Sequence, residues 1–310
     1  MRALVTGAAG FIGSHLCRRL VADGHEVVGL DDLSDGKLEN LASVPEVRFV
    51  EGDLRDEELV RSSAAGCDAV FHQGAMRSVP RSIVEPGKTT DVNVRGTLNV
   101  LLAARERPAT VVFASSSSVY GDRDEFPLRE SMRPLPRSPY AASKLAGEGY
   151  CRAWWLSFGV PTVALRYFNV YGPGQDPANA YAAVIPLFAI ACLNGTQPEI
   201  HGDGEQSRDF TFIDDVVEAN LLAARAPEPA RGEVFNIGGG ATPTSINEVL
   251  DIVARLTDTR PEPVHTETRA GDVRKTEADV TRAGDLIGYR PRVGIEDGLG
   301  RTVDWFRAPA

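Results

Sequence analysis

The stretch VTGAAGFIG, residues 5–13, decides how the rest of the sequence is interpreted. It places Gly7, Gly10 and Gly13 directly after a short apolar segment and at the start of a helical pattern. Glycine at these positions permits a tight turn, close approach of the backbone to a phosphate, and packing of the helix on the strand. The helix N-terminus then presents free N–H groups and a positive dipole end to a pyrophosphate. Although a lone glycine-rich turn is weak evidence, its place between strand and helix predicts a dinucleotide site.

A second apolar segment, residues 26–30, leads into a pair of carboxylates. Asp31 stands 18 residues beyond the last glycine of the turn. A carboxylate there can accept both hydroxyls of an adenosine ribose and would repel a 2′-phosphate, so NAD is favoured over NADP. Asp32 is the neighbouring candidate, and one of the two is expected to be only a turn residue. Asp53, after the third apolar segment, either accepts from the adenine amino group or caps a helix over 54–65.

Short apolar segments alternate with helical patterns through the first half of the chain. Buried strands are predicted at residues 3–7, 26–30, 48–52, 68–72, 110–116 and 162–168, and helices at 11–23, 56–65, 89–105 and 140–158. This alternation predicts an α/β fold with a parallel sheet covered by helices on both faces. After about residue 168, turn-rich segments predict a smaller lobe. The strand at 235–239 and a helix near 245–257 are expected to return to the main sheet.

The composition limits the function classes that need consideration. Hydrophobic residues make up 43% of the chain and charged residues 25%, as in ordinary globular proteins, and no apolar run is long enough for a membrane span. A net charge of −10 disfavours binding to nucleic acid or to an anionic membrane. The 4 cysteines and 5 histidines show no metal-ligand spacing. We therefore expect a cytoplasmic, metal-free protein with reduced thiols.

The segment SPYAASK, residues 138–144, pairs a tyrosine with one of only four lysines in the chain. In a helix Tyr140 and Lys144 share one face. The ammonium would then favour the phenolate and lower the pKa of the phenol below its usual value of about 10. A tyrosine tuned in this way can act as a base near neutral pH. On these residues alone, a solvated lysine one turn from a packed ring is an equally weighted alternative.

Further motifs extend along nearly the whole chain: SSSSVYG (115–121), NVRGTLNVL (93–101), RYFNVYGPGQ (166–175), SRDFTFIDDV (207–216) and RAGD (269–272). Together with G-x-x-G-x-x-G and YAASK, they make the chain resemble the extended short-chain dehydrogenase/reductase family, and within it the UDP-glucose or UDP-N-acetylglucosamine 4-epimerases. The resemblance implies a Rossmann-like doubly wound parallel sheet with a smaller C-terminal substrate-binding lobe. The NAD-binding domain would cover residues 1–168, with return segments near 208–240, and the UDP-sugar lobe mainly 169–310.

The resemblance also implies catalytic roles. Tyr140 would remove the proton of the sugar C4 hydroxyl, Lys144 would bind the nicotinamide ribose and hold the phenol pKa down, and Ser116 would hydrogen-bond the 4-oxygen. Hydride would pass from C4 to NAD⁺ and return to the opposite face of the 4-keto sugar. The NAD contacts implied are Gly7, Gly10, Phe11, Ile12, Gly13, Asp31, Asp32, Asp53, Leu54, Gln73, Ala75, Asn93, Tyr140, Lys144 and Tyr167. Asn93 is alternatively a helix cap or a brace for the Tyr140 region, and Tyr167 a core residue.

The UDP-sugar contacts implied are Ser118, Asn169, Arg208, Arg269 and Asp272. For the two arginines, the alternative to phosphate binding is a surface salt bridge. Similar epimerases are homodimers that pair the helices equivalent to 89–105 and 140–158, so a homodimer is expected. Thr276 aligns with the position whose bulk excludes an N-acetyl group, and its modest size predicts that UDP-GlcNAc can enter.

Three alternatives follow from where the motifs vary. A 4,6-dehydratase carries Asp-Glu after its catalytic Thr, whereas this chain has Ser117-Ser118, and serines cannot replace two carboxyl groups in removing a C5 proton. A UDP-glucuronate 4-epimerase would carry an arginine in the turn that here reads Gly174-Gln175-Asp176. A non-catalytic NAD-binding sensor would typically lack the tyrosine or the lysine. Arg77 departs from the small residue usual in similar epimerases, and it either reaches the NAD pyrophosphate or crowds the sugar.

Overall fold

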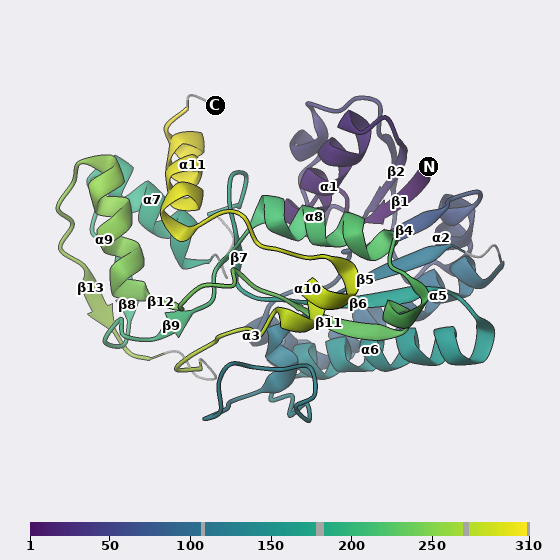
Figure 1. The fold of residues 1–310 in the computed structure, drawn as a ribbon. Helices are drawn as coiled ribbons and strands as arrows, with labels where there is room; N and C mark the ends of the chain where they lie inside the picture. The colour runs from purple at the N-terminus through teal and green to yellow at the C-terminus, as the bar shows by residue number, and fades with distance from the viewer. Residues whose placement is uncertain (107–108, 178–182, 269–272, 309–310) are drawn as a thin grey trace.

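The computed structural model describes residues 1–106, 109–177, 183–268 and 273–308. Its centre is a parallel sheet of seven strands in the order β11-β6-β5-β4-β1-β2-β3 (Figure 1). The strands are β1 (Arg2–Thr6), β2 (Glu26–Asp31), β3 (Arg48–Glu51), β4 (Ala69–His72), β5 (Thr110–Ser116), β6 (Thr162–Tyr167) and β11 (Glu233–Ile237). The predicted α/β fold with a doubly wound parallel sheet is confirmed.

Helices cover both faces of this sheet (Figure 1). On one face α1 (Phe11–Ala22) packs against α8 (Ile213–Ala224). On the other face lie α2 (Glu57–Ala64), α5 (Gly96–Glu106) and α6 (Pro139–Phe158).

Alternate strand residues supply two separate cores. Ala3 and Val5 of β1 belong to the same apolar cluster as Leu16 of α1, whereas Leu4 belongs to a second cluster with Val100 of α5. Successive strand side chains point to opposite faces, so a strand covered on both sides must be apolar throughout. This explains the continuous apolar runs in the sequence.

The smaller lobe gathers the C-terminal helices at one end of the sheet (Figure 1). In it, α7 (Val184–Asn194), α9 (Ile246–Thr257) and α11 (Ile295–Arg307) pack on one another. The strand predicted at 235–239 joins the main sheet as β11, but the helix predicted near 245–257 does not return with it. That part of the prediction is wrong, because α9 packs its apolar side on α7 and α11.

Short elements complete the chain. They are α3 (Val79–Val84), α4 (Pro86–Thr90), α10 (Thr281–Ile287), the paired strands β7 (Val170–Tyr171) and β10 (Thr211–Phe212), β8 (Glu199–His201) and β13 (Val264–Thr266), β9 (Ser207–Arg208) and β12 (Thr244–Ser245), and the single turns η1 (Leu38–Leu41), η2 (Asp91–Arg95), η3 (Ser117–Tyr120) and η4 (Glu228–Ala230). Over the described parts of the chain, no helix has the length and apolar character needed to cross a bilayer.

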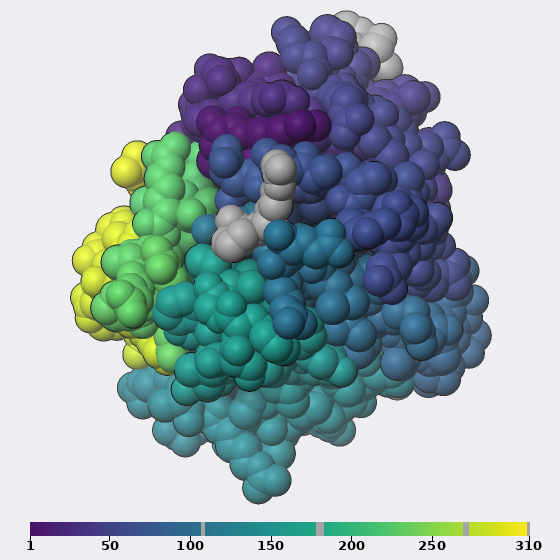
Figure 2. All heavy atoms as spheres, turned by 90° about the vertical axis from the view of Figure 1, so that its right-hand side faces the viewer, coloured from purple at the N-terminus to yellow at the C-terminus, as the bar shows by residue number. Residues whose placement is uncertain are grey.

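The surface of the molecule differs between the amino ends and the carboxyl ends of the strands. Figure 2 looks from the side on which β1 begins, and packed side chains form a closed surface there. A pocket instead meets the carboxyl ends of the strands, next to the turns that follow β1, β4 and β5. Open parallel sheets bind their ligands at this edge.

Candidate active site

One pocket of about 720 Å³ brings together nearly all of the site residues predicted from the sequence. Its walls include Gly7, Gly10, Phe11, Ile12, Gly13, Asp31, Asp32, Asp53, Leu54, Gln73, Ala75, Ser116, Ser118, Tyr140, Lys144, Tyr167, Asn169, Arg208 and Thr276. Asn93 does not line it. Arg269 and Asp272 lie outside the described residues.

The glycine turn forms a cradle of bare backbone. Gly7 has a φ of +66°, and its N–H donates to the Leu30 carbonyl at 2.8 Å. A Cβ on Gly13 would lie 1.9 Å from the Gly7 oxygen, so only glycine allows α1 to approach the turn this closely. No side chain caps the N-terminus of α1, and its first turn holds no acidic residue. These features fit a dinucleotide pyrophosphate, which needs free N–H groups and no competing negative charge.

The carboxylates near the ends of β2 and β3 differ in their partners. The Asp31 carboxylate accepts from the backbone N–H of Ala9 at 3.0 Å, and burial raises its pKa. Asp31 and Asp32 each accept a backbone N–H from two residues further on, Asp31 from Leu33 at 2.8 Å and Asp32 from Ser34 at 3.0 Å, and only Asp31 is bonded to the glycine turn. Asp53 binds the guanidinium of Arg55, whereas Asp56 caps α2; the alternative role of Asp53 as helix cap is therefore wrong.

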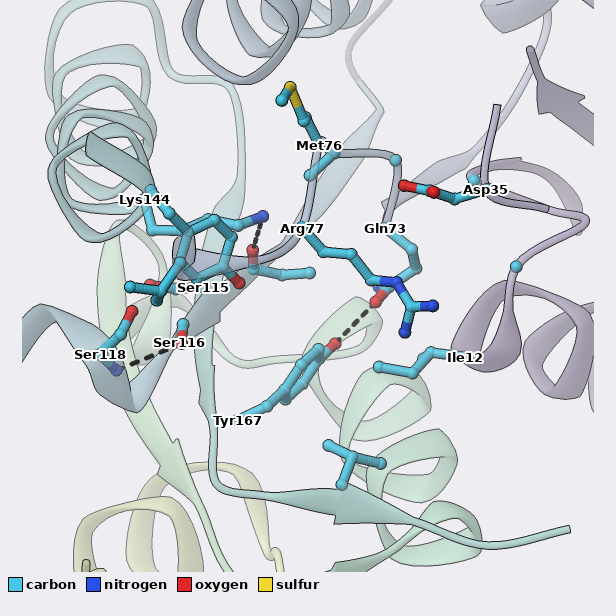
Figure 3. Close-up of a pocket in the computed structure, with 18 of the residues that line it drawn as sticks. Ile12, Asp35, Gln73, Met76, Arg77, Ser115, Ser116, Ser118, Lys144 and Tyr167 are labelled. Atoms are coloured by element: carbon cyan, nitrogen blue, oxygen red, sulfur yellow. Dashed lines mark hydrogen bonds between the residues drawn. The ribbon is translucent and has the colours of Figure 1, made fainter. Parts of the chain in front are cut away.

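The predicted catalytic residues meet where α6 crosses the end of β5 (Figure 3). Lys144 is only 4% exposed, and its Nζ donates to the Ala114 carbonyl at 2.7 Å. Burial lowers the pKa of Lys144 to about 8. A buried lysine with one carbonyl partner has hydrogen-bond donors to spare for a ligand hydroxyl.

The expectation that Lys144 lowers the pKa of Tyr140 gains no support from this arrangement and stays a prediction for the NAD-bound site. Burial raises the pKa of Tyr140, while a hydrogen bond with Ser116 and the positive charge of Arg77 act in the opposite direction. The Lys144 ammonium lies 5.9 Å from the centre of the Tyr140 ring and donates to a backbone carbonyl. The Lys144 ammonium therefore lies beside the ring of Tyr140. The groups that act to lower the pKa of the phenol in this arrangement are Ser116 and Arg77.

Asn93 acts as a brace, one of the two alternatives that the sequence left open. The helix predicted over 89–105 contains a π-helical turn, η2, and Asn93 lies buried in its middle. Its amide accepts from the Met76 N–H at 2.8 Å and donates to the Ser143 hydroxyl at 2.9 Å. Ser143 in turn donates to the Tyr140 carbonyl. Asn93 thus fixes the backbone beside Arg77 to the helix that carries Tyr140.

Tyr167 is held at the pocket wall by two amides. Its hydroxyl donates to Gln73 Oε1 at 3.2 Å and receives the Asn220 amide at 2.8 Å, while Gln73 donates to Asn220 Oδ1 at 2.9 Å. The sequence reasoning missed Asn220. The available signal was an asparagine in the mainly apolar run VVEANLLAA, since a buried amide requires partners.

On the substrate side of the pocket, some polar side chains are hydrogen-bonded within the protein and the Ser118 hydroxyl is not. Asn169 donates to the Thr276 hydroxyl at 3.0 Å, and the Asp209 N–H donates to the same oxygen. Arg208 is buried at the wall and donates to the Ser207 carbonyl. The Ser118 hydroxyl is buried without a hydrogen-bond partner among the described residues. A buried, unpartnered hydroxyl on a pocket wall suits contact with a polar ligand.

Comparison with known proteins shows which family has this sequence and fold. Residues 3–238 match the NAD dependent epimerase/dehydratase family. A UDP-glucose 4-epimerase of Mycolicibacterium smegmatis is 42% identical, with 99% of each chain covered. The UDP-N-acetylglucosamine 4-epimerase of Methanobrevibacter ruminantium, in complex with UDP-N-acetylmuramic acid, has a TM-score of 0.93 and 38% identity, with 99% and 98% of the chains covered. The UDP-glucose 4-epimerase of Thermus thermophilus in complex with NAD has a TM-score of 0.92 and 38% identity over 100% of both chains.

Proposed function

This chain belongs to the NAD dependent epimerase/dehydratase family, and we propose that it is a 4-epimerase that interconverts UDP-glucose and UDP-galactose and their N-acetylated counterparts. The observation that carries the proposal is the convergence of Ser116, Tyr140 and Lys144 on the pocket that holds the glycine turn. Ser117 and Ser118 stand where a 4,6-dehydratase has carboxylates, which favours epimerisation over dehydration.

NAD is the cofactor, and the residues present fit it. The glycine turn and the N-terminus of α1 would hold the pyrophosphate, Asp31 the adenosine ribose, and Lys144 the nicotinamide ribose. When bound, NAD⁺ supplies a hydride acceptor for the sugar C4 carbon and a positively charged ring in the pocket.

Tyr140 moves the proton in both halves of the reaction. Burial holds the phenol in its protonated form, which can give a proton to the 4-keto oxygen of the sugar. The Ser116 hydrogen bond and the Arg77 charge favour the phenolate, which takes the proton from the C4 hydroxyl. Ser116 would also orient the 4-oxygen toward the phenol.

The sugar lobe would be formed mainly by residues 169–310. Asn169 and Arg208 line the pocket from this side and would contact the UDP diphosphate, while Ser118 would contact the sugar from the β5 side. Arg269 and Asp272 remain proposals from the family resemblance. A homodimer would cover the exposed Leu156 and Phe158 at the end of α6.

A coupled assay tests the proposal directly. We expect the protein to convert both UDP-glucose and UDP-GlcNAc, because Thr276 is small and its hydroxyl is held by Asn169 and the Asp209 N–H. Thr276→Tyr should retain UDP-glucose turnover and lose most UDP-GlcNAc turnover, and Thr276→Ser should retain both. No conversion of either UDP-sugar would contradict the epimerase proposal. Turnover of UDP-glucose alone would contradict only the wider substrate range.

We propose that Arg77 acts on the cofactor side of the pocket. Its guanidinium extends toward Ile12 of the glycine turn, away from Ser118 (Figure 3), and has no ion pair with any residue in the described ranges. Of the two roles that the sequence left open, the structure favours contact with the pyrophosphate. An exposed cation beside a dianionic diphosphate gains charge-assisted hydrogen bonds.

Arg77→Ala should therefore weaken NAD binding by about tenfold to hundredfold, the loss expected for hydrogen bonds to a charged group. Arg77→Lys should restore part of this affinity. Isothermal titration with NAD and the KM for UDP-glucose separate the two roles. Unchanged NAD affinity with a lower KM for the sugar would show that Arg77 crowds the sugar instead.

A further inference from the structure

A buried ion pair lies directly beneath the catalytic residues. Glu148 of α6 and Arg166 of β6 are 5% and 3% exposed. Glu148 Oε1 accepts from Arg166 Nε at 2.8 Å, and Oε2 accepts from Nη2 at 2.7 Å. The same Oε1 accepts from the Ser115 hydroxyl at 2.5 Å. None of these three residues was predicted as a site residue, although Ser115 precedes Ser116 directly.

We propose that Ser115 and Glu148 are positioning residues that set the rotation of α6 against β5 and thereby align Tyr140 with Ser116. This inference rests on the proposed function, since it assigns the alignment a role in the proton transfer. The opposing interpretation is a purely structural ion pair that stabilises the fold without affecting the reaction.

The helix geometry supports the positioning role. Tyr140, Lys144 and Glu148 are spaced four residues apart, so they form one row along α6. All three face the last residues of β5: Lys144 donates to the Ala114 carbonyl, Glu148 accepts from Ser115, and Tyr140 lies beside Ser116, which acts to lower the phenol pKa. Two contacts one helical turn apart define how α6 is rotated, and the position of the phenol follows from that rotation.

The far side of the ion pair is fixed as well. Ser115 pairs with Arg166 in register between β5 and β6. The Arg166 guanidinium lies 4.6 Å from the centre of the Tyr120 ring, and the Tyr120 hydroxyl donates to Asn236 of β11 at 2.7 Å. Glu148 is therefore tied to β5 and β6, and Arg166 is tied in turn through Tyr120 to β11, which opposes a rotation of α6. The pair is bidentate, and Arg166 Nη1 is buried with no hydrogen-bond partner among the described residues. Breaking the pair would leave a charge buried without partners, so the pair favours one arrangement.

Ser115→Ala removes the hydroxyl link and leaves the Glu148–Arg166 pair intact. Thr162→Val is a matched control, because Thr162 on β6 also donates a buried hydroxyl to α6, to the Cys151 carbonyl at 2.6 Å, but lies at the end of the strand remote from the pocket. Both variants should lose a similar amount of thermal stability. We expect only Ser115→Ala to lower kcat, by on the order of tenfold with KM unchanged, since small misplacements of reacting groups cost rate rather than affinity.

A second measurement reads Tyr140 independently of turnover. The difference in ultraviolet absorbance between each protein and its Tyr140→Phe partner gives the titration of this one phenol. Ser115→Ala should move the midpoint to higher pH, because the Ser116 hydrogen bond that favours the phenolate is weakened, whereas Thr162→Val should not. Equal kcat and equal Tyr140 midpoints for the two variants would overturn the inference. In another outcome, the parent converts no UDP-sugar while Ser115→Ala still shifts the midpoint of the Tyr140 titration. That result would contradict the proposed function but would support the role of Ser115 in aligning Tyr140 with Ser116.

Discussion

Tyr140→Phe is expected to lower kcat for UDP-glucose by about 10²- to 10⁴-fold, the usual contribution of a positioned acid or base. The phenol lies in the pocket beside Ser116, which acts to lower its pKa, and the substitution removes only the phenol oxygen. NAD binding should change little, because the glycine turn and Asp31 lie elsewhere on the pocket wall. The coupled assay gives the rate, and the absorbance of the purified protein and titration with NAD give the cofactor content and affinity.

Tyr150→Phe supplies the matched control. Tyr150 lies on the same helix, packs on Trp154 with ring centres 5.9 Å apart, and does not line the pocket. Its loss of a phenol oxygen should leave the rate within about twofold, as for surface substitutions away from special features. If Tyr140→Phe retained more than a tenth of the parent rate, the acid/base role would be wrong. A parent protein that binds NAD but shows no turnover would instead support the sensor alternative.

The fold was predictable because its signals are local. The inner strands β1, β2, β4, β5 and β6 are buried on both faces, so each had to be a short apolar run, and the turn of residues 5–13 identified the first strand and helix. The wrong placement of α9 has a physical reason. Its apolar stripe predicts a covered helix equally well whether the cover is a sheet or, as observed, the helices α7 and α11. Sequence periodicity predicts which face of a helix is buried, but it does not predict which element covers that face.

The site was predictable where function depends on residue type and spacing, and less so where it depends on orientation. The spacing of Tyr140 and Lys144 correctly placed both at the pocket, but not the direction of the ammonium, which turns to the Ala114 carbonyl. The Ser115–Glu148 contact joins residues 33 positions apart, and only the packing of α6 on β5 brings them together. The π-helical turn around Asn93 was equally hidden, and so was the hydrogen bond that Asn93 accepts from the distant Met76 backbone.

Gly13→Ala is expected to reduce NAD affinity by at least about hundredfold and to lower stability by about 1–3 kcal/mol, the usual cost of overpacking. The added Cβ would lie 1.9 Å from the Gly7 oxygen and 2.9 Å from the Ala8 Cα, and both of these are backbone atoms. Since neither can rotate away, the turn itself must move. The free N–H groups at the start of α1 would then no longer converge on the pyrophosphate, and each lost hydrogen bond to a charged group costs about 1.5–3 kcal/mol.

Gly149→Ala separates this local effect from the general effect of replacing glycine in a helix. A Cβ on Gly149 in α6 meets no atom within 4 Å, so this variant should be as stable as the parent or more stable. Titration with NAD and thermal unfolding of the two variants make the comparison. Suppose that the Gly13→Ala protein folds and binds NAD as tightly as the parent. The pyrophosphate would then be held without close approach to the glycine turn, and this result would contradict the proposed binding site. Equal loss of affinity in both variants would indicate a general effect of replacing a helical glycine rather than a local effect at the glycine turn.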